Sequence, residues 1–264
     1  MNITKKILIS DFDYTLYDHD NPSNTAENLL AVTRWRRAGN LFIVATGRNL
    51  TSLRLTFPNY RDYVDYLVLN DGATVIRAMD GEVLHRDTIK EKIVTDFTAE
   101  LRQANFANDY AVIGYYGDKE LNEIKPNCYK FRLWFKTQDD CMIAEDILST
   151  KFERRLHYYS YHSVDFNFDA RLDWINDDMK CVIEVNLAGT NKKTGLSALF
   201  DKLNIGNKHT IIAVGDDQND ICMLEAYDGY FIGKTREDIR RRLPGTTVVP
   251  HLHTLIANQL KAPA

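Results

Sequence analysis

The stretch Lys6–Thr15, KILISDFDYT, decides the fold and gives the first indication of chemistry. Its apolar run Ile7–Ile9 is typical of a fully buried parallel strand. The run ends in two aspartates two positions apart, Asp11 and Asp13, with a hydroxyl following at Thr15. Open α/β sheets bind ligands at the carboxyl ends of their strands. Two carboxylates at such an end are costly without a cation between them, and their hard oxygen ligands suit Mg²⁺.

The remaining composition describes an ordinary globular protein. The chain has 264 residues, enough for one large domain or two modest ones, with 44% hydrophobic and 27% charged residues. Its net charge of −4 argues against a nucleic-acid-binding surface and against an anchor to acidic membranes. We find neither a signal peptide nor a membrane span, which predicts a cytoplasmic protein. Four cysteines without metal-type spacing are expected to be buried thiols of a reducing compartment: Cys128, Cys141, Cys181 and Cys222.

The first part of the chain alternates strands and helices. A helix that Pro22 and Ser23 lead into precedes a second buried strand, Leu41–Ala45, and another helix over Leu50–Phe57 precedes a third strand, Tyr66–Leu69. This βαβαβ order predicts a parallel, doubly wound sheet. The order returns after Gly189 with the following elements: an amphipathic helix over Leu196–Leu203, strands at Thr210–Val214 and Tyr230–Ile232, and helices near Glu237–Leu243 and Thr254–Leu260.

The middle third reads differently. Strict alternation over Tyr129–Lys136 predicts a half-exposed antiparallel strand, and Asp139 or Asp140 is expected to cap the helix that follows. Further predicted elements are a helix with Ile89, Ile93, Phe97 and Leu101 on one face, and strands at Leu156–Tyr161, Val164–Phe168 and Cys181–Leu187. We therefore interpret the middle third as an inserted α+β domain with its own sheet.

Four places carry chemistry, and each has a plainer alternative. Asp11 can attack an electrophilic phosphorus, and Asp13 can exchange a proton with a leaving or attacking oxygen; the alternative is a solvated strand end. Thr46 and Gly47 offer a hydroxyl and backbone N–H groups to a phosphate, with Arg48 as an anion clamp. For Thr46 the alternative is a helix N-cap, and for Arg48 a surface charge.

The other two places lie near the end of the chain. Lys192, or its neighbour Lys193, can neutralise phosphoryl oxygens, unless it is only a solvated lysine at a helix start. The segment GDDQND, Gly215–Asp220, follows a buried strand and offers a Mg²⁺ site with supporting groups, or else a polar turn. Its candidate residues are Asp216, Asp217, Asn219 and Asp220. Because three of the four places follow buried strands and the fourth opens a helix, all four can converge on one sheet edge.

As a set, these motifs resemble those of the haloacid dehalogenase superfamily: DFDYT, TGR, NKKTGL and GDDQND. The likeness is strongest to the Cof-type sugar-phosphate phosphatases, whose N-G-A segment is similar to Asn70–Ala73. Two positions depart from the pattern. Tyr14 stands where many members have Gly, and Asp71 splits the usual N-G pair, which leaves the role of Asn70 open.

The resemblance implies a role for each motif residue. Asp11 would be the nucleophile and a Mg²⁺ ligand, and Asp13 the general acid/base, binding the metal through its backbone carbonyl. Asp216 would complete the metal ligands, and Thr46 and Lys192 would hold the phosphoryl group. The resemblance implies supporting roles for Asn219 and Asp220, and we place Asp217 beside them.

The spacing of the motifs locates the insertion. Only 32 residues separate Asp13 from Thr46, whereas 145 separate Thr46 from Lys192, which leaves room for about a hundred extra residues. The resemblance implies that these form a C2-type cap. We therefore expect a Rossmann-like doubly wound core over 1–81 and 188–264 and an α/β cap over 82–187.

The sequence thus predicts a Mg²⁺-dependent phosphatase for a small phosphorylated metabolite, a sugar phosphate first of all. Two alternatives stay open. One is a phosphosugar mutase or phosphotransferase, and the other is a phosphosugar-binding protein without turnover. The substrate itself, the cap residues that select it and the oligomeric state do not follow from the sequence.

Overall fold

The protein is described by a computed structural model that covers residues 6–117, 119–162, 181–206 and 209–261. Its contacts divide the chain into two compact units, each with its own sheet. The first comprises Met1–Arg86 and Asn191–Ala264, and the second comprises Asp87–Thr190.

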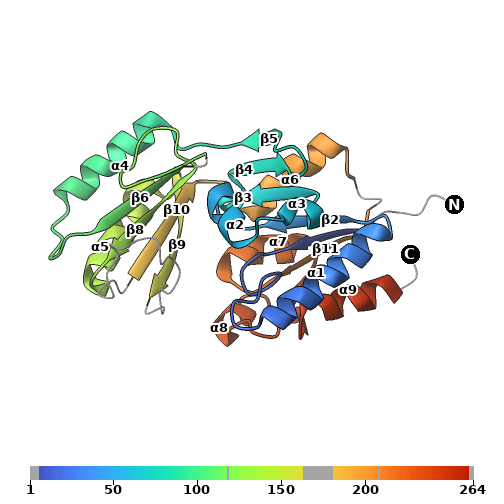
Figure 1. Ribbon diagram of the computed structural model, residues 1–264. Helices are drawn as coiled ribbons and strands as arrows, with labels where there is room; N and C mark the ends of the chain where they lie inside the picture. The colour runs from blue at the N-terminus through green and yellow to red at the C-terminus, as the bar shows by residue number, and fades with distance from the viewer. Residues whose placement is uncertain (1–5, 118, 163–180, 207–208, 262–264) are drawn as a thin grey trace. The chain divides into compact units, whose positions relative to one another are not determined.

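The first unit is built on an eight-stranded sheet within the described residues, in the order β13-β12-β11-β1-β2-β3-β4-β5 (Figure 1). The strands are parallel from β13 to β3, and β4 and β5 are antiparallel to their neighbours. Their bounds are β1 Ile7–Ser10, β2 Leu41–Ala45, β3 Tyr66–Leu69, β4 Thr74–Arg77, β5 Val83–Arg86, β11 Ile211–Gly215, β12 Asp228–Ile232 and β13 Thr247–Val249.

Helices cover both faces of this sheet, because its buried strands carry apolar side chains on both sides. In β1, Leu8 packs in one core, which includes residues of α1, α2 and α9. Ile7 and Ile9 pack in the other, with α6, α7 and α8. The helical bounds are α1 Pro22–Arg37, α2 Leu50–Thr56, α3 Tyr60–Tyr63, α6 Lys192–Leu203, α7 Ile221–Ala226, α8 Glu237–Arg240 and α9 Leu252–Lys261, with short turns η1 Asn70–Gly72 and η3 Gln218–Asp220. The predicted doubly wound α/β core is confirmed.

The hairpin β4–β5 was not predicted and shifts the expected edge of the core. Thr74–Arg77 pairs with both Tyr66–Leu69 and Val83–Arg86 in antiparallel fashion. The sequence predicts a boundary between residues 81 and 82, so that residues 83–86 are expected in the insertion. In the structure these residues form β5 and belong to the core sheet. At the other boundary, residues 188–190, expected in the core, fall in the second unit.

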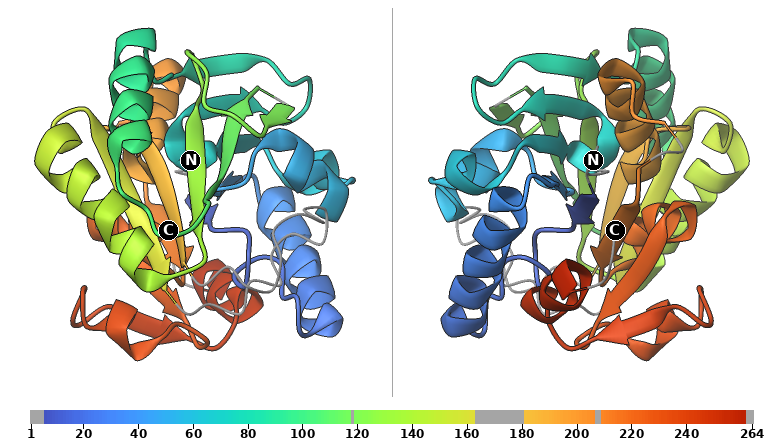
Figure 2. Two further views of the ribbon diagram at one scale, coloured as in Figure 1. Left: turned by 90° about the vertical axis from the view of Figure 1, so that its left-hand side faces the viewer. Right: turned by 90° about the vertical axis from the view of Figure 1, so that its right-hand side faces the viewer.

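The second unit holds an antiparallel sheet in the order β7-β6-β8-β10-β9. Helices α4 and α5 pack on one face of it, as Figure 1 and Figure 2 show. The bounds are α4 Glu91–Gln103, β6 Ala111–Tyr116, β7 Lys119–Leu121, β8 Lys130–Phe135, α5 Gln138–Ile147, η2 Leu148–Phe152, β9 Leu156–His162 and β10 Cys181–Leu187. The strand predicted at Val164–Phe168 lies outside the described residues.

The alternating strand β8 is less exposed than predicted. Phe131, Leu133 and Phe135 pack under the helices, as expected. On the opposite face, however, Lys130 and Trp134 are buried as well. Lys130 donates from Nζ to Glu184 Oε1 at 2.7 Å, and Arg132 pairs with the same carboxylate. A shared counter-ion compensates these charges, so a charged residue in an alternating pattern does not have to face water.

The predicted cap of the helix in this unit is wrong. Thr137 caps α5, accepting a hydrogen bond from the N–H of Asp140, so neither Asp139 nor Asp140 is the cap. Asp140 lies in the first turn, where its carboxylate accepts from the Ala107 N–H at 2.7 Å. Its pKa is lowered because the hydrogen bonds it accepts outweigh the effect of burial.

The cysteine prediction also needs correction. Cys141 and Cys181 form a disulfide, because α5 and β10 bring their Cα atoms to 6.3 Å, while Cys128 and Cys222 are free. The cysteines therefore no longer support a reducing compartment. Among the described residues, no helix is long and apolar enough to cross a membrane.

The two ends of the second unit meet. Thr190 donates from Oγ1 to Asp87 Oδ2 at 3.3 Å, so the first and last residues of this unit lie side by side.

Candidate active site

The register of the central strands brings the predicted residues to one edge of the first unit's sheet. The last residue of β1, Ser10, is level with Val44 in β2 and with Val214 in β11. Since the three strands are parallel, the residues that leave their carboxyl ends emerge together. These residues are Asp11, Thr46 and Asp216.

Lys192 joins two of the acidic residues at this edge. It opens α6, and its side chain is completely buried. Its Nζ donates to Asp11 Oδ1 at 2.6 Å and to Asp220 Oδ1 at 2.5 Å. The neighbouring Lys193 is exposed. The structure therefore selects Lys192 from the two lysines that the sequence left open.

Asp220 fixes the acidic turn. Its Oδ2 accepts the backbone N–H groups of Asp216 at 2.9 Å and Asp217 at 3.0 Å, while Oδ1 binds Lys192. Both of its oxygens are thus engaged within the protein. Asp220 is therefore suited to orient Lys192 and the turn that carries Asp216.

Three carboxylates gather closely enough to hold a cation. One carboxylate oxygen each of Asp11, Asp216 and Asp220 lies within 4.8 Å of the other two. Thr15 donates from Oγ1 to Asp216 Oδ1 at 2.8 Å. Thr15 was visible in the first motif as a hydroxyl after two aspartates, but its partner, 201 positions away, could not be read from the sequence.

The electrostatics of this cluster favour an added positive charge. Burial raises the pKa of Asp11 well above its usual value, and Lys192 only partly offsets this. Burial and Asp220 raise the pKa of Asp216 to about 8. Burial would lower the pKa of Lys192, but Asp11, Asp220 and Asp71 raise it. A divalent cation between the carboxylates would favour their ionised forms, so the donor set fits Mg²⁺.

Asp13 lies in a different setting. Its carboxylate accepts from Arg48 Nε at 2.8 Å and from Arg48 Nη2 at 2.7 Å, and it contacts His19 Nε2 at 2.7 Å. Burial would raise the pKa of Asp13, but the hydrogen bonds from His19 and Arg48 lower it to about 2. His19 belongs to none of the motifs, so nothing in the sequence pointed to it.

Arg48 is held by the protein itself. Besides Asp13, it donates from Nη1 to Thr56 Oγ1 at 2.9 Å and to Ser52 Oγ at 3.2 Å. The sequence left open whether Arg48 is an anion clamp or a surface charge. In the structure its guanidinium lies on Asp13, the acid/base candidate.

Thr46 does not cap a helix. The cap of α2 is Asn49, whose side chain accepts the N–H of Ser52 at 2.7 Å. Thr46 is 1% exposed, and its Oγ1 accepts the N–H of Arg48 at 3.1 Å across Gly47. The hydroxyl and this tight turn stay at the sheet edge, as a phosphate-binding loop requires.

The last two candidates lie in the acidic turn. Asp217 accepts the N–H of Gln218 at 2.7 Å, and burial raises its pKa. Asn219 donates from Nδ2 to Asp71 Oδ1 at 2.8 Å. Asp71 appeared in the sequence only as a departure from a family pattern, and the structure makes it a direct neighbour of the acidic turn.

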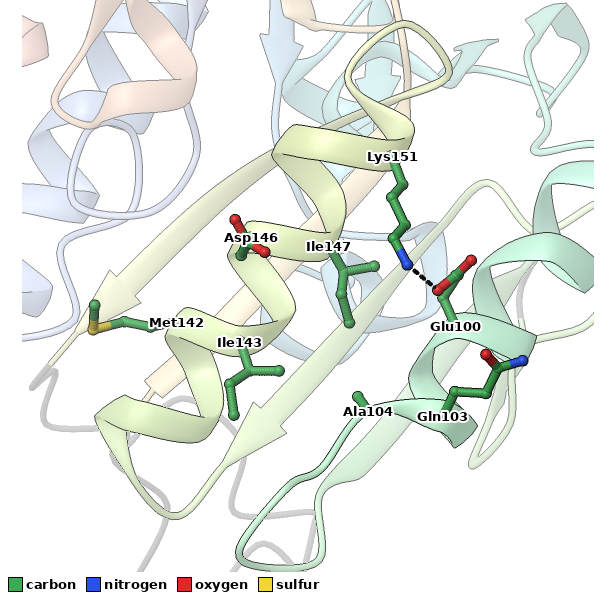
Figure 3. Close-up of a pocket in the computed structure, with 8 residues that line it drawn as sticks. All are labelled: Glu100, Gln103, Ala104, Met142, Ile143, Asp146, Ile147 and Lys151. Atoms are coloured by element: carbon green, nitrogen blue, oxygen red, sulfur yellow. Dashed lines mark hydrogen bonds and ion pairs between the residues drawn. The ribbon is translucent and has the colours of Figure 1, made fainter.

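A hollow of about 500 Å³ lies elsewhere, between α4 and α5 of the second unit. Figure 3 shows Lys151 reaching across it to Glu100 over apolar side chains. It is lined by Glu100, Gln103, Ala104, Met142, Ile143, Asp146, Ile147 and Lys151. None of the predicted site residues is among them, so the hollow has no part in the chemistry derived above.

Comparison with known proteins identifies the family of this chain. A sequence profile of the haloacid dehalogenase-like hydrolases matches residues 8–239, and the chain belongs to this family. The phosphatase YwpJ of Bacillus subtilis is 22% identical over 289 residues, covering 97% of this chain and 99% of that protein.

Solved structures show the same fold. A HAD/COF-like hydrolase from Plasmodium vivax superposes with a TM-score of 0.73 at 20% identity, covering 98% of this chain and 97% of its own. The subclass IIB sugar phosphatase BT4131 superposes with a TM-score of 0.70 at 17% identity, covering 97% of each chain. The expected resemblance to haloacid dehalogenase-like, Cof-type proteins is confirmed.

Proposed function

We propose that this hydrolase is a Mg²⁺-dependent phosphatase that cleaves phosphoric monoesters of small metabolites, sugar phosphates first of all. The observation that carries the proposal is the buried contact of Lys192 with Asp11, beside the carboxylate of Asp216. A cation and a carboxylate cluster at one sheet edge suit an anionic substrate whose charge must be neutralised during transfer. The named phosphatase relatives favour the same chemistry.

In this proposal, Asp11 attacks phosphorus and the ester oxygen leaves, so that the phosphoryl group is carried on the Asp11 carboxylate. Lys192, together with the Thr46 hydroxyl and the N–H groups around Gly47, holds the phosphoryl oxygens. Water then attacks the same phosphorus and restores the Asp11 carboxylate.

Asp13 moves the protons in this scheme. It donates to the leaving ester oxygen and later accepts a proton from the attacking water. Because His19 and Arg48 hold its pKa near 2, Asp13 begins as a base. Acting as an acid requires that its carboxylate loosen these two contacts and gain a proton first.

Asp11 and Asp216, with the backbone carbonyl of Asp13, would hold Mg²⁺, which supplies positive charge to the phosphoryl oxygens when bound. Asp220 supports the site, because Lys192 and two backbone N–H groups already occupy its oxygens. Asp217 and Asn219 support the same turn. We assign the second unit as the C2-type cap of this family.

The experiment is a phosphate-release assay on a broad panel of phosphorylated metabolites, with Mg²⁺ and with chelator, beside an Asp11→Asn control. We expect Mg²⁺-dependent release that the substitution abolishes. The proposal fails if no panel member is hydrolysed. It also fails if a phosphosugar is isomerised faster than phosphate is released, since the protein would then be a mutase.

A further inference from the structure

The turn Asn70–Gly72 has an unusual backbone. Asn70, Asp71 and Gly72 have φ values of 51°, 53° and 100°, three left-handed residues in a row. Asn and Asp tolerate this conformation better than other side chains, but for them it is still uncommon. The turn is also buried, with Asn70 1% and Asp71 0% exposed. Such a conformation persists only when its surroundings hold it firmly.

The turn is tied through its backbone to Thr46–Arg48, the loop that binds phosphate in the proposed function and is called the phosphate-binding loop below. The N–H of Asn70 donates to the carbonyl oxygen of Arg48 at 3.0 Å, and the N–H of Asp71 donates to that of Thr46 at 3.1 Å. The left-handed backbone points two successive N–H groups at one loop. The turn Asn70–Gly72 therefore holds the backbone of Thr46 in place.

The turn also lies directly against the start of α6. A Cβ added at Gly72 would overlap the backbone oxygen of Asn191, the residue before Lys192. A Cβ added at Gly195 would come within 2.7 Å of the Gly72 Cα. The two backbones touch without intervening side chains, so the turn sets the place where Lys192 enters the site.

The third contact of the turn is made by a side chain. Asp71 accepts from Asn219 Nδ2 at 2.8 Å and so reaches the acidic turn that carries Asp216 and Asp220. A completely buried carboxylate is costly and requires compensation by hydrogen bonds or charges. Asp71 finds part of this compensation in Asn219, and part in the charge of Lys192.

We infer that Asp71 is a positioning residue of the active site, which orients Asn219 and locks the acidic turn to the phosphate-binding loop and to the start of α6. This inference rests on the proposed function, because it assigns Asp71 to that reaction. Asp71 acts through Asn219 and needs no contact with the substrate.

The test compares two substitutions of Asp71, by Asn and by Gly, because both of these residues tolerate the left-handed backbone of this position. Asp71→Asn keeps an acceptor oxygen for Asn219, whereas Asp71→Gly removes the side chain without backbone strain. With p-nitrophenyl phosphate and Mg²⁺, we expect Asp71→Gly to lower kcat by about 10- to 100-fold, the scale set by small misplacements in an active site, with little change in KM. Asp71→Asn should restore most of that loss.

A matched control is Asn204→Gly. Asn204 is exposed, caps the far end of α6 and has the same φ of 53°. Its replacement should leave kcat unchanged. A double-mutant cycle with Asn219→Ala adds a measurement that general destabilisation would not move: the Asp71→Gly/Asn219→Ala protein should be no slower than Asn219→Ala alone.

Several results would overturn the inference. They are equal rates for Asp71→Gly and wild type, a change confined to KM, or additive effects in the cycle. Crystal structures of both Asp71 variants test the placement without any activity, since Asn219 should keep its orientation in Asp71→Asn and lose it in Asp71→Gly. An inactive wild-type protein would refute the proposed function alone and leave this structural test to decide the inference.

Discussion

Replacing Lys192 by methionine tests the central contact of the site. The substitution keeps the length of the side chain and removes a completely buried ammonium from Asp11 and Asp220. Breaking a buried ion pair by removing one partner costs about 3–5 kcal/mol, because the remaining charge is left uncompensated. Here one ammonium serves two carboxylates whose side chains are only 11% and 0% exposed, so we expect the upper part of that range.

The loss of stability should depend on pH. Burial already raises the pKa of Asp11 in wild type, and losing the ammonium raises it further, so the folded variant binds the Asp11 proton more tightly than folded wild type does. The two unfolded chains titrate Asp11 alike, so the stability deficit grows as pH rises through the raised pKa of Asp11 and shrinks as pH falls below it. Urea unfolding of both proteins at pH 5 and pH 8, in chelator, measures this difference.

Activity gives the second readout. Loss of a group that stabilises developing negative charge costs roughly 10²–10³-fold in kcat. The neighbouring Lys193→Met is the matched control, since Lys193 is exposed and its replacement should change stability by less than about 0.5 kcal/mol. The reasoning is refuted if the two variants behave alike, or if Lys192→Met unfolds at the wild-type urea concentration with wild-type kcat.

Four further predictions address the rest of the first unit. Asp11→Asn should lower kcat by roughly 10⁴-fold or more, as removal of a nucleophile does, and a smaller loss in the phosphate-release assay would argue against a covalent step. Since the pKa of Asp216 is about 8, Mg²⁺ binding at pH 7 should release a proton; calorimetry in two buffers of different ionisation enthalpy detects it, and a buffer-independent heat would contradict the assignment. The pKa of Asp13, about 2 against 3.8, corresponds to about 2 kcal/mol of stability that is present above pH 4 and lost as pH falls through 2. The urea midpoints of wild type and Asp13→Asn should therefore converge as pH falls. A constant difference between the two midpoints at every pH would contradict the lowered pKa of Asp13. Gly72→Ala should destabilise by roughly 4 kcal/mol or more, because it adds a steric overlap to its left-handed φ, whereas Gly245→Ala, with φ 87° and open space, should cost only about 1–2 kcal/mol; equal thermal shifts would exclude the overlap.

The parts of the fold that the sequence predicted well are those with local signals. Leu41–Ala45, Tyr66–Leu69 and Cys181–Leu187 are continuous apolar or alternating runs, and the structure has strands with the same bounds. The hairpin β4–β5 also carried a usable signal, since Asp80-Gly81 is a favoured turn between two strands. Gly81 has φ 79°, as such a turn requires.

Other features depend on partners far along the chain. The clamp of Arg48 on Asp13 spans 35 positions, and that of Asn219 on Asp71 spans 148. No periodicity or local propensity records such pairs, because they arise only when strands are aligned in the sheet. The Cys141–Cys181 disulfide likewise arises only when α5 packs on β10. The sequence therefore predicts that the motif residues meet at one edge, but not which of them touch.

The contact between Asp87 and Thr190 bears on how the chain folds. The sheet of the first unit pairs β1 with β11, so its two halves must meet across the whole intervening second unit. For a flexible segment of that length, bringing the ends together costs about 4 kcal/mol of chain entropy. Once the second unit has folded, its own packing holds those ends within hydrogen-bond reach. The two halves of the first unit can then find each other almost as if a short connection joined them.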